Sequence, residues 1–291
     1  MFFVIAVFSN SSYAIDIVKT KHPGTFDKKA EHRIELIKRA LEITEPEYGP
    51  FRIDKYTQET SVGRSLKALV DRKLINTMIM PANDLWDSYS IPIKVPVRLG
   101  LLSYRVLLVN KDHLPAFEDT TSLQELNKLT AGLISGWATT KAFKFNRMKL
   151  VGVDHFDGLF LMLKKHRFDY IPRGINEVDD ELRSRKSSLD GLVVEPSIAL
   201  YIPTSTNFYI AKSEPRLAKR LETGLKIMLN SGELKDILYK YFAEHIERAN
   251  IAGRKVFKIE NPYHNQNNKA DEKYYIFSAM DQKLINTSKL Q

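Results

Sequence analysis

The chain has 291 residues, with 44 lysines and arginines against 35 aspartates and glutamates, and therefore a formal charge of +9. Hydrophobic residues make up 43% of it and glycine and proline are scarce, which excludes collagen-like and low-complexity chains and predicts a globular protein of one large or two smaller domains. Because cysteine is absent, the chain holds no disulfide, no thiolate zinc site and no cysteine nucleophile.

The first 14 residues are a candidate targeting segment. An unbroken apolar run over residues 2–8 is followed by small polar residues, and Ser12-Tyr13-Ala14 has the small-x-small form of a signal-peptidase site. The run is too short to span a bilayer, which takes about 20 apolar residues. We interpret residues 1–14 as the back half of a secretory signal whose start lies upstream; the alternative is a first buried β-strand.

Strands and helices are expected to alternate over the first part of the mature chain. Alternating or apolar runs predict strands at residues 15–18, 51–56 and 76–80, and helical spacing of apolar residues predicts helices at 33–44 and 64–74. This alternation is typical of a parallel α/β sheet.

A second set of alternating elements follows. Strands are expected at 101–109, 129–134, 150–153 and 168–171, and helices at 122–126, 141–148, 156–165 and 176–185. Two more strands (198–202 and 207–211) and two helices (214–230 and 234–242) come next, and the polar residues beyond 262 predict an irregular tail.

Four segments, in order along the chain, carry a family resemblance. They are IPIKVPVRLGLLSYRVLLVNKD (91–112), SLQELNKLTAGLISGWATT (122–140), LFLMLKKHRFDYIPRG (159–174) and LAKRLETGLKIMLNSGELKDILYKYF (217–242). Together they resemble the periplasmic substrate-binding proteins of the type 2 superfamily, the family 3-like group that includes polar amino-acid receptors of ABC transporters. The second segment is similar to that group's ligand loop, and the third to its strand beside the ligand.

The resemblance implies an α/β fold of two Rossmann-like lobes joined by a two-stranded hinge, with a ligand cleft between the lobes. Lobe 1 would comprise 15–107 plus 198–262, lobe 2 would comprise 108–197, and 263–291 would be a polar tail. The implied function is a periplasmic, monomeric solute-binding protein. It would bind a small polar or anionic solute, amino-acid-like or a carboxylate, and serve an inner-membrane transporter or sensor, with no cofactor and no metal.

Arg173 marks a departure from the resembled group. Those receptors place a carboxylate for the ligand's ammonium a few residues beyond an Arg-x-Asp-Ala phrase, and here Arg173 follows Asp169 instead. An arginine would repel an ammonium and bind a carboxylate or phosphate in bidentate fashion. The alternative is a surface arginine paired with Glu177. Arg98 and Arg105 are the candidates for the arginine that the group keeps on its first lobe.

Three residues at the start of one expected helix are further candidate ligand contacts. Trp137 follows a glycine at a strand end, where it could lie over a ligand or pack half-buried. Thr139 and Thr140 could donate hydroxyls to the ligand or cap the helix.

Another three candidate contacts lie elsewhere in the chain. Tyr170, next to Asp169, could face the cleft or the core. Trp86, in an expected loop, could wall the ligand or pack on the hinge. Arg64 could turn toward the cleft or remain solvated.

The sequence contains no catalytic or metal-binding motif that we could assign. It lacks a glycine-rich phosphate loop and a Gly-x-Ser-x-Gly elbow, and its histidines show no i,i+4 pairing. An enzyme on the same two-lobe fold, acting on a small carboxylate, remains the alternative. The charge of +9 does not form a basic stripe, since residues 111–197 hold 13 cations and 13 anions, so no nucleic-acid binding is expected.

Overall fold

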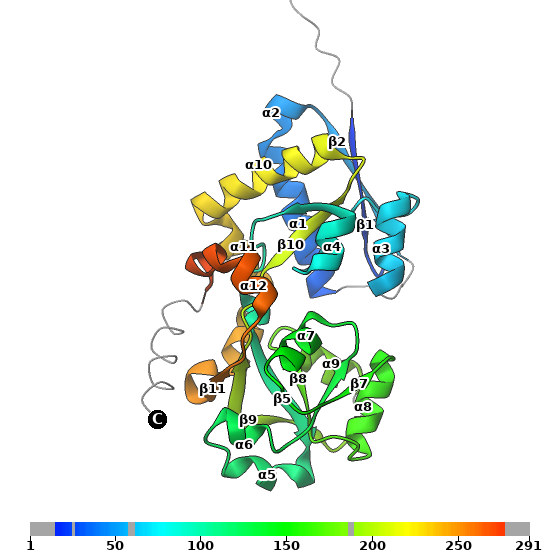
Figure 1. Ribbon diagram of the computed structural model, residues 1–291. Helices are drawn as coiled ribbons and strands as arrows, with labels where there is room; N and C mark the ends of the chain where they lie inside the picture. The colour runs from blue at the N-terminus through cyan, green and yellow to red at the C-terminus, as the bar shows by residue number, and fades with distance from the viewer. Residues whose placement is uncertain (1–14, 25–26, 58–61, 186–188, 277–291) are drawn as a thin grey trace, which may run out of the picture.

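The structure is a computed structural model that describes residues 15–24, 27–57, 62–185 and 189–276. The expected signal segment, 1–14, and the last part of the expected tail, 277–291, lie outside the described residues. Figure 1 shows two α/β lobes, one above the other. No helix within the described ranges is long and apolar enough to cross a membrane.

The first lobe contains two small sheets with helices packed on them. Its strands are β1 (Asp16–Lys21), β2 (Phe51–Tyr56), β3 (Thr77–Pro81), β4 (Ser90–Ile93) and β10 (Thr206–Ala211), and its helices are α1 (Lys28–Ile43), α2 (Glu45–Tyr48), α3 (Val62–Asp71), α4 (Asp84–Tyr89) and α10 (Pro215–Ser231). β1 pairs with β2 in parallel, and β10 lies antiparallel between β3 and β4. The side chain of Asn76 joins the two sheets, since it accepts from Lys19 N–H at 2.7 Å and donates to the Ile17 carbonyl at 2.8 Å.

The core of the first lobe comes from the helical spacing visible in the sequence. Leu36, Ile37 and Leu41 form one face of α1, and Leu221 and Leu225 form one face of α10. All five side chains are fully buried in one cluster, because apolar residues spaced three and four apart lie on the same side of a helix.

The second lobe contains a six-stranded sheet in the order β11-β9-β5-β8-β6-β7. Its strands are β5 (Tyr104–Asn110), β6 (Ala131–Ile134), β7 (Leu150–Val153), β8 (Tyr170–Gly174), β9 (Leu192–Tyr201) and β11 (Lys255–Lys258), and its helices are α5 (Pro115–Glu118), α6 (Leu123–Leu126), α7 (Ala138–Phe145), α8 (Phe156–Lys164) and α9 (Val178–Ser184). β5 is antiparallel to both of its neighbours, whereas β6 is parallel to β7 and β8.

Helix α11 (Glu233–Ala249) belongs to the cores of both lobes. Leu234 and Ile237 pack in the cluster formed by α1 and α10, while Leu238 and Phe242 pack in the cluster under the six-stranded sheet. The helix therefore links the two lobes through buried apolar contacts.

Two neighbouring segments, 94–103 and 202–205, connect the sheets of the two lobes. Ser103 lies at their contact: its carbonyl accepts from Ile202 N–H at 2.7 Å, and its Oγ accepts from Thr204 N–H at 3.0 Å. The sequence placed the crossings near residues 107 and 198, but both positions lie inside paired strands of the second sheet. β5 is buried along its whole length and apolar over residues 106–109, so its sequence carries no signal of where the sheet begins.

The segment after β11 packs against both crossing segments, although the sequence predicted an irregular tail. It forms α12 (Pro262–Asn267) and a 3-10 turn at Lys269–Tyr274. Tyr263 donates to Asp87 of α4 at 2.7 Å, Ser205 hydrogen-bonds Asp271 at 2.9 Å, and Ile276 N–H donates to the Leu99 carbonyl at 3.0 Å. The segment that follows β11 of the second lobe is therefore bound to α4 of the first lobe and to both crossing segments.

Candidate functional site

A layer of charged side chains lies where the two lobes meet, and we call it the interlobe charge cluster. Its members are Asp27, Lys29, Arg33, Arg98, Arg105, Arg173, Glu177 and Glu181. The first three come from the start of α1, Arg98 from a crossing segment, and the others from β5, β8 and the first turns around α9. Arg98 interacts electrostatically with Glu177 of the second lobe and Asp27 of the first, so the cluster spans both lobes.

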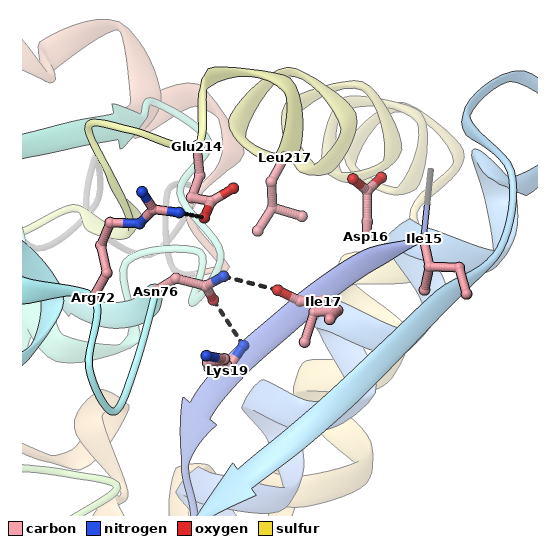
Figure 2. Close-up of a pocket in the computed structure, with 8 residues that line it drawn as sticks. All are labelled: Ile15, Asp16, Ile17, Lys19, Arg72, Asn76, Glu214 and Leu217. Atoms are coloured by element: carbon pink, nitrogen blue, oxygen red, sulfur yellow. Dashed lines mark hydrogen bonds and ion pairs between the residues drawn. The ribbon is translucent and has the colours of Figure 1, made fainter. Parts of the chain in front are cut away.

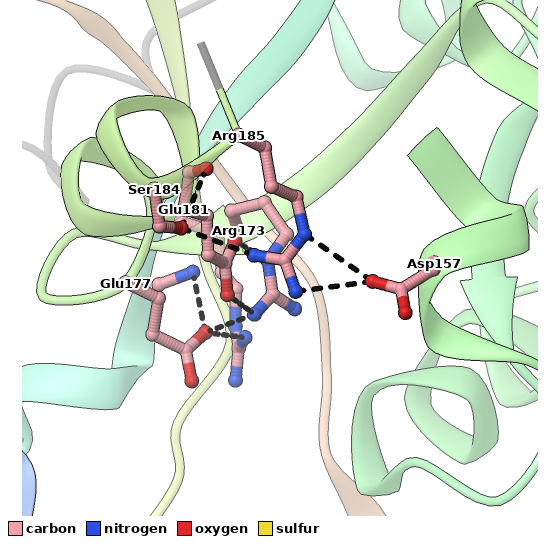
Figure 3. Close-up of polar contacts among 8 residues, drawn as sticks. Asp157, Arg173, Glu177, Glu181, Ser184 and Arg185 are labelled. Atoms are coloured by element: carbon pink, nitrogen blue, oxygen red, sulfur yellow. Dashed lines mark hydrogen bonds and ion pairs between the residues drawn. The ribbon is translucent and has the colours of Figure 1, made fainter. Parts of the chain in front are cut away.

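Arg173 lies between two carboxylates, as Figure 3 shows. Its Nε donates to Glu181 Oε2 at 2.8 Å, a second nitrogen donates to Glu181 Oε1, and the same nitrogen lies 3.0 Å from Glu177 Oε2. Burial by itself would lower the pKa of Arg173, but the two carboxylates hold this pKa above its ordinary value. Its guanidinium also lies 4.6 Å from the centre of the Trp137 ring.

Arg105 is buried with much weaker compensation. Only 6% of it is exposed, its guanidinium approaches Glu177 no closer than 3.8 Å, and its Nε has no hydrogen-bond partner among the described residues. Burial lowers the pKa of Arg105 to about 10, and Glu177 offsets this only in part. Glu177 itself is closer to Arg173 and accepts from Gly174 N–H at 3.1 Å.

Arg98 is a second buried cation of the cluster, and it interacts with a carboxylate from each lobe. It is 8% exposed, its Nε lacks a partner within the described part of the chain, and burial lowers its pKa. Asp27, one of the two carboxylates near it, accepts from Ala30 N–H at 2.7 Å as the N-cap of α1. That capping bond fixes Asp27 at the helix terminus.

Other buried polar atoms around the cluster also lack partners. Asn176, fully buried in the loop that carries Glu177, has neither its amide nitrogen nor its oxygen paired with a described residue. Arg33 donates to the Lys21 carbonyl, but its Nε has no hydrogen-bond partner among the described residues. Burial and the adjacent arginines hold the pKa of His32 well below its ordinary value, so this ring is neutral.

The structure brings three of the predicted site residues together. Arg105, Arg173 and Trp137 all lie at the cluster. Thr139 and Thr140 start α7 next to Trp137, and the Thr140 hydroxyl donates to the Ile134 carbonyl at 2.7 Å, in keeping with a local structural role. The pairing of Arg173 with Glu177, foreseen as the alternative, is present, but it is buried rather than on the surface.

The other three predicted residues lie away from the cluster. Trp86 belongs to helix α4 rather than to a loop, and it packs 1% exposed against Tyr209 with ring centres 5.4 Å apart. Tyr170 is buried in the core of the second lobe, 6.1 Å from the Phe117 ring. Arg64 lies exposed on α3.

Sequence reasoning missed several members of the cluster. Glu181 was not among the predicted site residues, yet it is the bidentate partner of Arg173. A partial signal was available, because Glu177 and Glu181 are four residues apart within the expected helix 176–185 and so lie on the same face of it. Lys29 carried no such signal, since its partner Glu177 lies far along the chain.

A separate hollow of about 280 Å³, drawn in Figure 2, lies at the start of β1 on the first lobe. Its polar groups already bind one another: Arg72 pairs with Glu214 at 2.8 Å, Asp16 with Arg220 at 2.7 Å, and Asn76 with the backbone of β1. A ligand there would have to break these bonds, so the interlobe cluster is the better candidate site. Among the described residues, no group of three or more His, Asp and Glu side chains is arranged to hold a metal.

Comparison with solved structures identifies the fold. The chain is similar to the substrate-binding protein of an amino acid ABC transporter, with a TM-score of 0.52 and 13% identity over 79% of this chain and 100% of that one. It is also similar to an ancestral arginine-binding protein bound to arginine, with a TM-score of 0.53 and 16% identity over 78% and 98% of the two chains. The chain has the two-lobe fold of the periplasmic binding proteins. The fold predicted from the four sequence segments is therefore confirmed.

The same fold occurs in a sensor as well as in transport proteins. A histidine kinase sensor domain with similarity to periplasmic binding proteins gives a TM-score of 0.53 at 12% identity, over 79% of this chain and 96% of that one. No protein-family model and no curated protein matches the sequence. This chain thus adopts the two-lobe periplasmic-binding-protein fold although its sequence differs strongly from those of the solved structures.

Proposed function

We propose that this protein is a periplasmic solute-binding protein, which captures a small polar or anionic solute between its lobes and presents it to an inner-membrane ABC transporter or sensor. It acts as a monomer after export to the periplasm. The solute is amino-acid-like or a carboxylate, and closure of the lobes around it is what the partner recognises.

One observation carries this proposal: the interlobe charge cluster holds five cationic side chains against three carboxylates. Buried charge is costly unless it is paired and hydrogen-bonded. The unpaired Nε atoms of Arg98 and Arg105 are donors that an anionic solute would satisfy. A purely structural ion-pair network would be expected to balance its charges.

The enzyme alternative has less support from the site. Glu177 and Glu181 are both committed to Arg173, and Asp27 caps α1, so no carboxylate of the cluster is free to act as a general base. The similar structures named above are a transport receptor, an arginine-binding protein and a sensor domain.

The proposal is tested by a thermal-shift screen of the purified protein against amino acids, carboxylates, phosphorylated solutes and sugars. A solute that binds only the native state stabilises it by about 2.7 kcal/mol at a concentration 100 times its Kd, which raises Tm. We expect at least one anionic solute to do so. A panel without any stabilising solute, or turnover of a solute that binds, would contradict the proposal.

A further inference from the structure

The chemistry of the ligand can be narrowed further, in an inference that rests on the proposed function. The three carboxylates of the interlobe charge cluster already have partners: Glu181 and Glu177 bind Arg173, and Asp27 binds the backbone of α1. Arg173 is therefore matched by more than one carboxylate. The other four cations of the cluster have little negative charge near them to offset their own; they are Lys29, Arg33, Arg98 and Arg105.

Arg98 and Arg105 are the two remaining cations best placed to meet a ligand. Both are buried, both have an unpaired Nε among the described residues, and both act electrostatically on Glu177. Arg98 is on a crossing segment that faces α1, whereas Arg105 is on β5 of the second lobe. A ligand held by both would therefore join the lobes directly.

Charge decides between classes of ligand at such a place. A zwitterionic amino acid brings no net charge, and its ammonium would enter a layer that already has an excess of cations. A cationic amino acid would add to the excess. A dianion would offset it, and the planar guanidinium suits carboxylate or phosphate oxygens, which it can bind in bidentate fashion.

We infer that Arg98 and Arg105 hold a compact dianionic solute between the lobes, and that Arg173 is a positioning residue, which fixes Glu177 and Glu181 instead of touching the ligand. Asn176, fully buried on the same loop as Glu177 and unpaired on both amide atoms, supplies a neutral donor and acceptor close to the cluster. The dianion could be a dicarboxylate or a phosphate-type solute.

The test is calorimetric titration of the full chain with succinate, inorganic phosphate, glycine and L-arginine, each at the same pH and ionic strength. Binding of succinate alone assigns a dicarboxylate, and binding of phosphate alone assigns a phosphate-type solute. Preferred binding of glycine or L-arginine overturns the inference and leaves the proposed function standing. Binding of none of the four probes overturns the inference, and the wider screen then decides whether the proposed function also fails.

Two variants test the residue assignment with the anion that binds. Arg98→Gln and Arg105→Gln should each weaken binding tenfold or more, because each removes a charge-assisted hydrogen bond to the ligand. Arg52→Gln is the matched control, since Arg52 is exposed on β2 and pairs only with its neighbour Asp54 in the described structure. Unchanged affinity in both cluster variants would overturn the assignment.

A second pair of measurements separates lost contacts from misfolding. Arg98→Lys and Arg105→Lys keep the charge but lose the bidentate fork, so we expect them to bind more tightly than the glutamine variants and less tightly than the parent. Far-UV circular dichroism and Tm identify any variant that is not folded. A lysine variant that binds no better than its folded glutamine counterpart would contradict a charge-based role.

Discussion

Arg173 is 4% exposed, with its guanidinium between Glu177, Glu181 and the Trp137 ring. An arginine so placed is held in one orientation by two carboxylates and one aromatic face. It in turn orients Glu177, the carboxylate that interacts with Arg98, Arg105 and Lys29. At the scale of one residue, Arg173 organises the site by fixing the charges around it.

Replacement of Arg173 should therefore lower the free energy of unfolding, because its main contacts are within the protein. Arg173→Ala leaves Glu177 and Glu181 buried without their cation, and breaking a buried ion pair from one side costs about 3–5 kcal/mol. The measurement is the free energy of unfolding in urea, with Arg183→Ala as control because Arg183 pairs with Asp180 at the exposed side of α9. An unfolding free energy equal to that of the parent would show that Arg173 is not structural.

At the scale of elements, helices α1 and α10 approach unusually closely at Gly224. A Cβ atom built on Gly224 would lie 2.4 Å from the carbonyl oxygen of Ala40, which is too short for any real contact. The glycine is thus required by the packing of two helices, although glycine is a poor helix former and costs about 1 kcal/mol relative to alanine.

We expect Gly224→Ala to destabilise the protein. The gain in helix propensity of about 1 kcal/mol is outweighed by overpacking, which costs about 1–3 kcal/mol, and by the separation of two faces that hold the core of the first lobe. Urea unfolding measures the result, and Thr223→Ala, one position away and half-buried, is the control. A more stable Gly224→Ala variant would mean that α1 and α10 can move apart at no cost.

At the scale of the whole molecule, residues 259–276 form a further connection between the two lobes, beside the crossing segments 94–103 and 202–205. Tyr275 is 4% exposed and its ring lies against Gly100, where a Cβ atom would be 2.3 Å away and where φ is +72°. The ring therefore fits only against a glycine, which tolerates this backbone conformation.

Removal of this ring should loosen the junction of the lobes. Tyr275→Ala is expected to cost about 3 kcal/mol, the usual loss for a buried aromatic side chain, and to lower Tm. Tyr274→Ala is the matched control, since Tyr274 is 36% exposed. Equal Tm values for the two variants would show that the segment does not stabilise the junction.

Much of the element order could be predicted because the signals are local. The strand expected at 51–56 is β2, and the helix expected at 214–230 is α10 within one residue at each end. The helix expected at 122–126 is α6, and it begins with a capping box formed by Ser122 and Glu125. Helix α4 was missed, because six residues with Trp86 on one side give no repeated helical spacing.

The sequence by itself predicted alternating strands and helices, and the two-lobe fold followed from the resemblance that four short segments carry. Only the tertiary structure decided which charges meet. Lys29, Arg98 and Glu177 are separated by about 70–80 residues each and come together only when both lobes are assembled. Because electrostatic energy depends on distance and burial, the composition could show an excess of positive charge but not its place between the lobes.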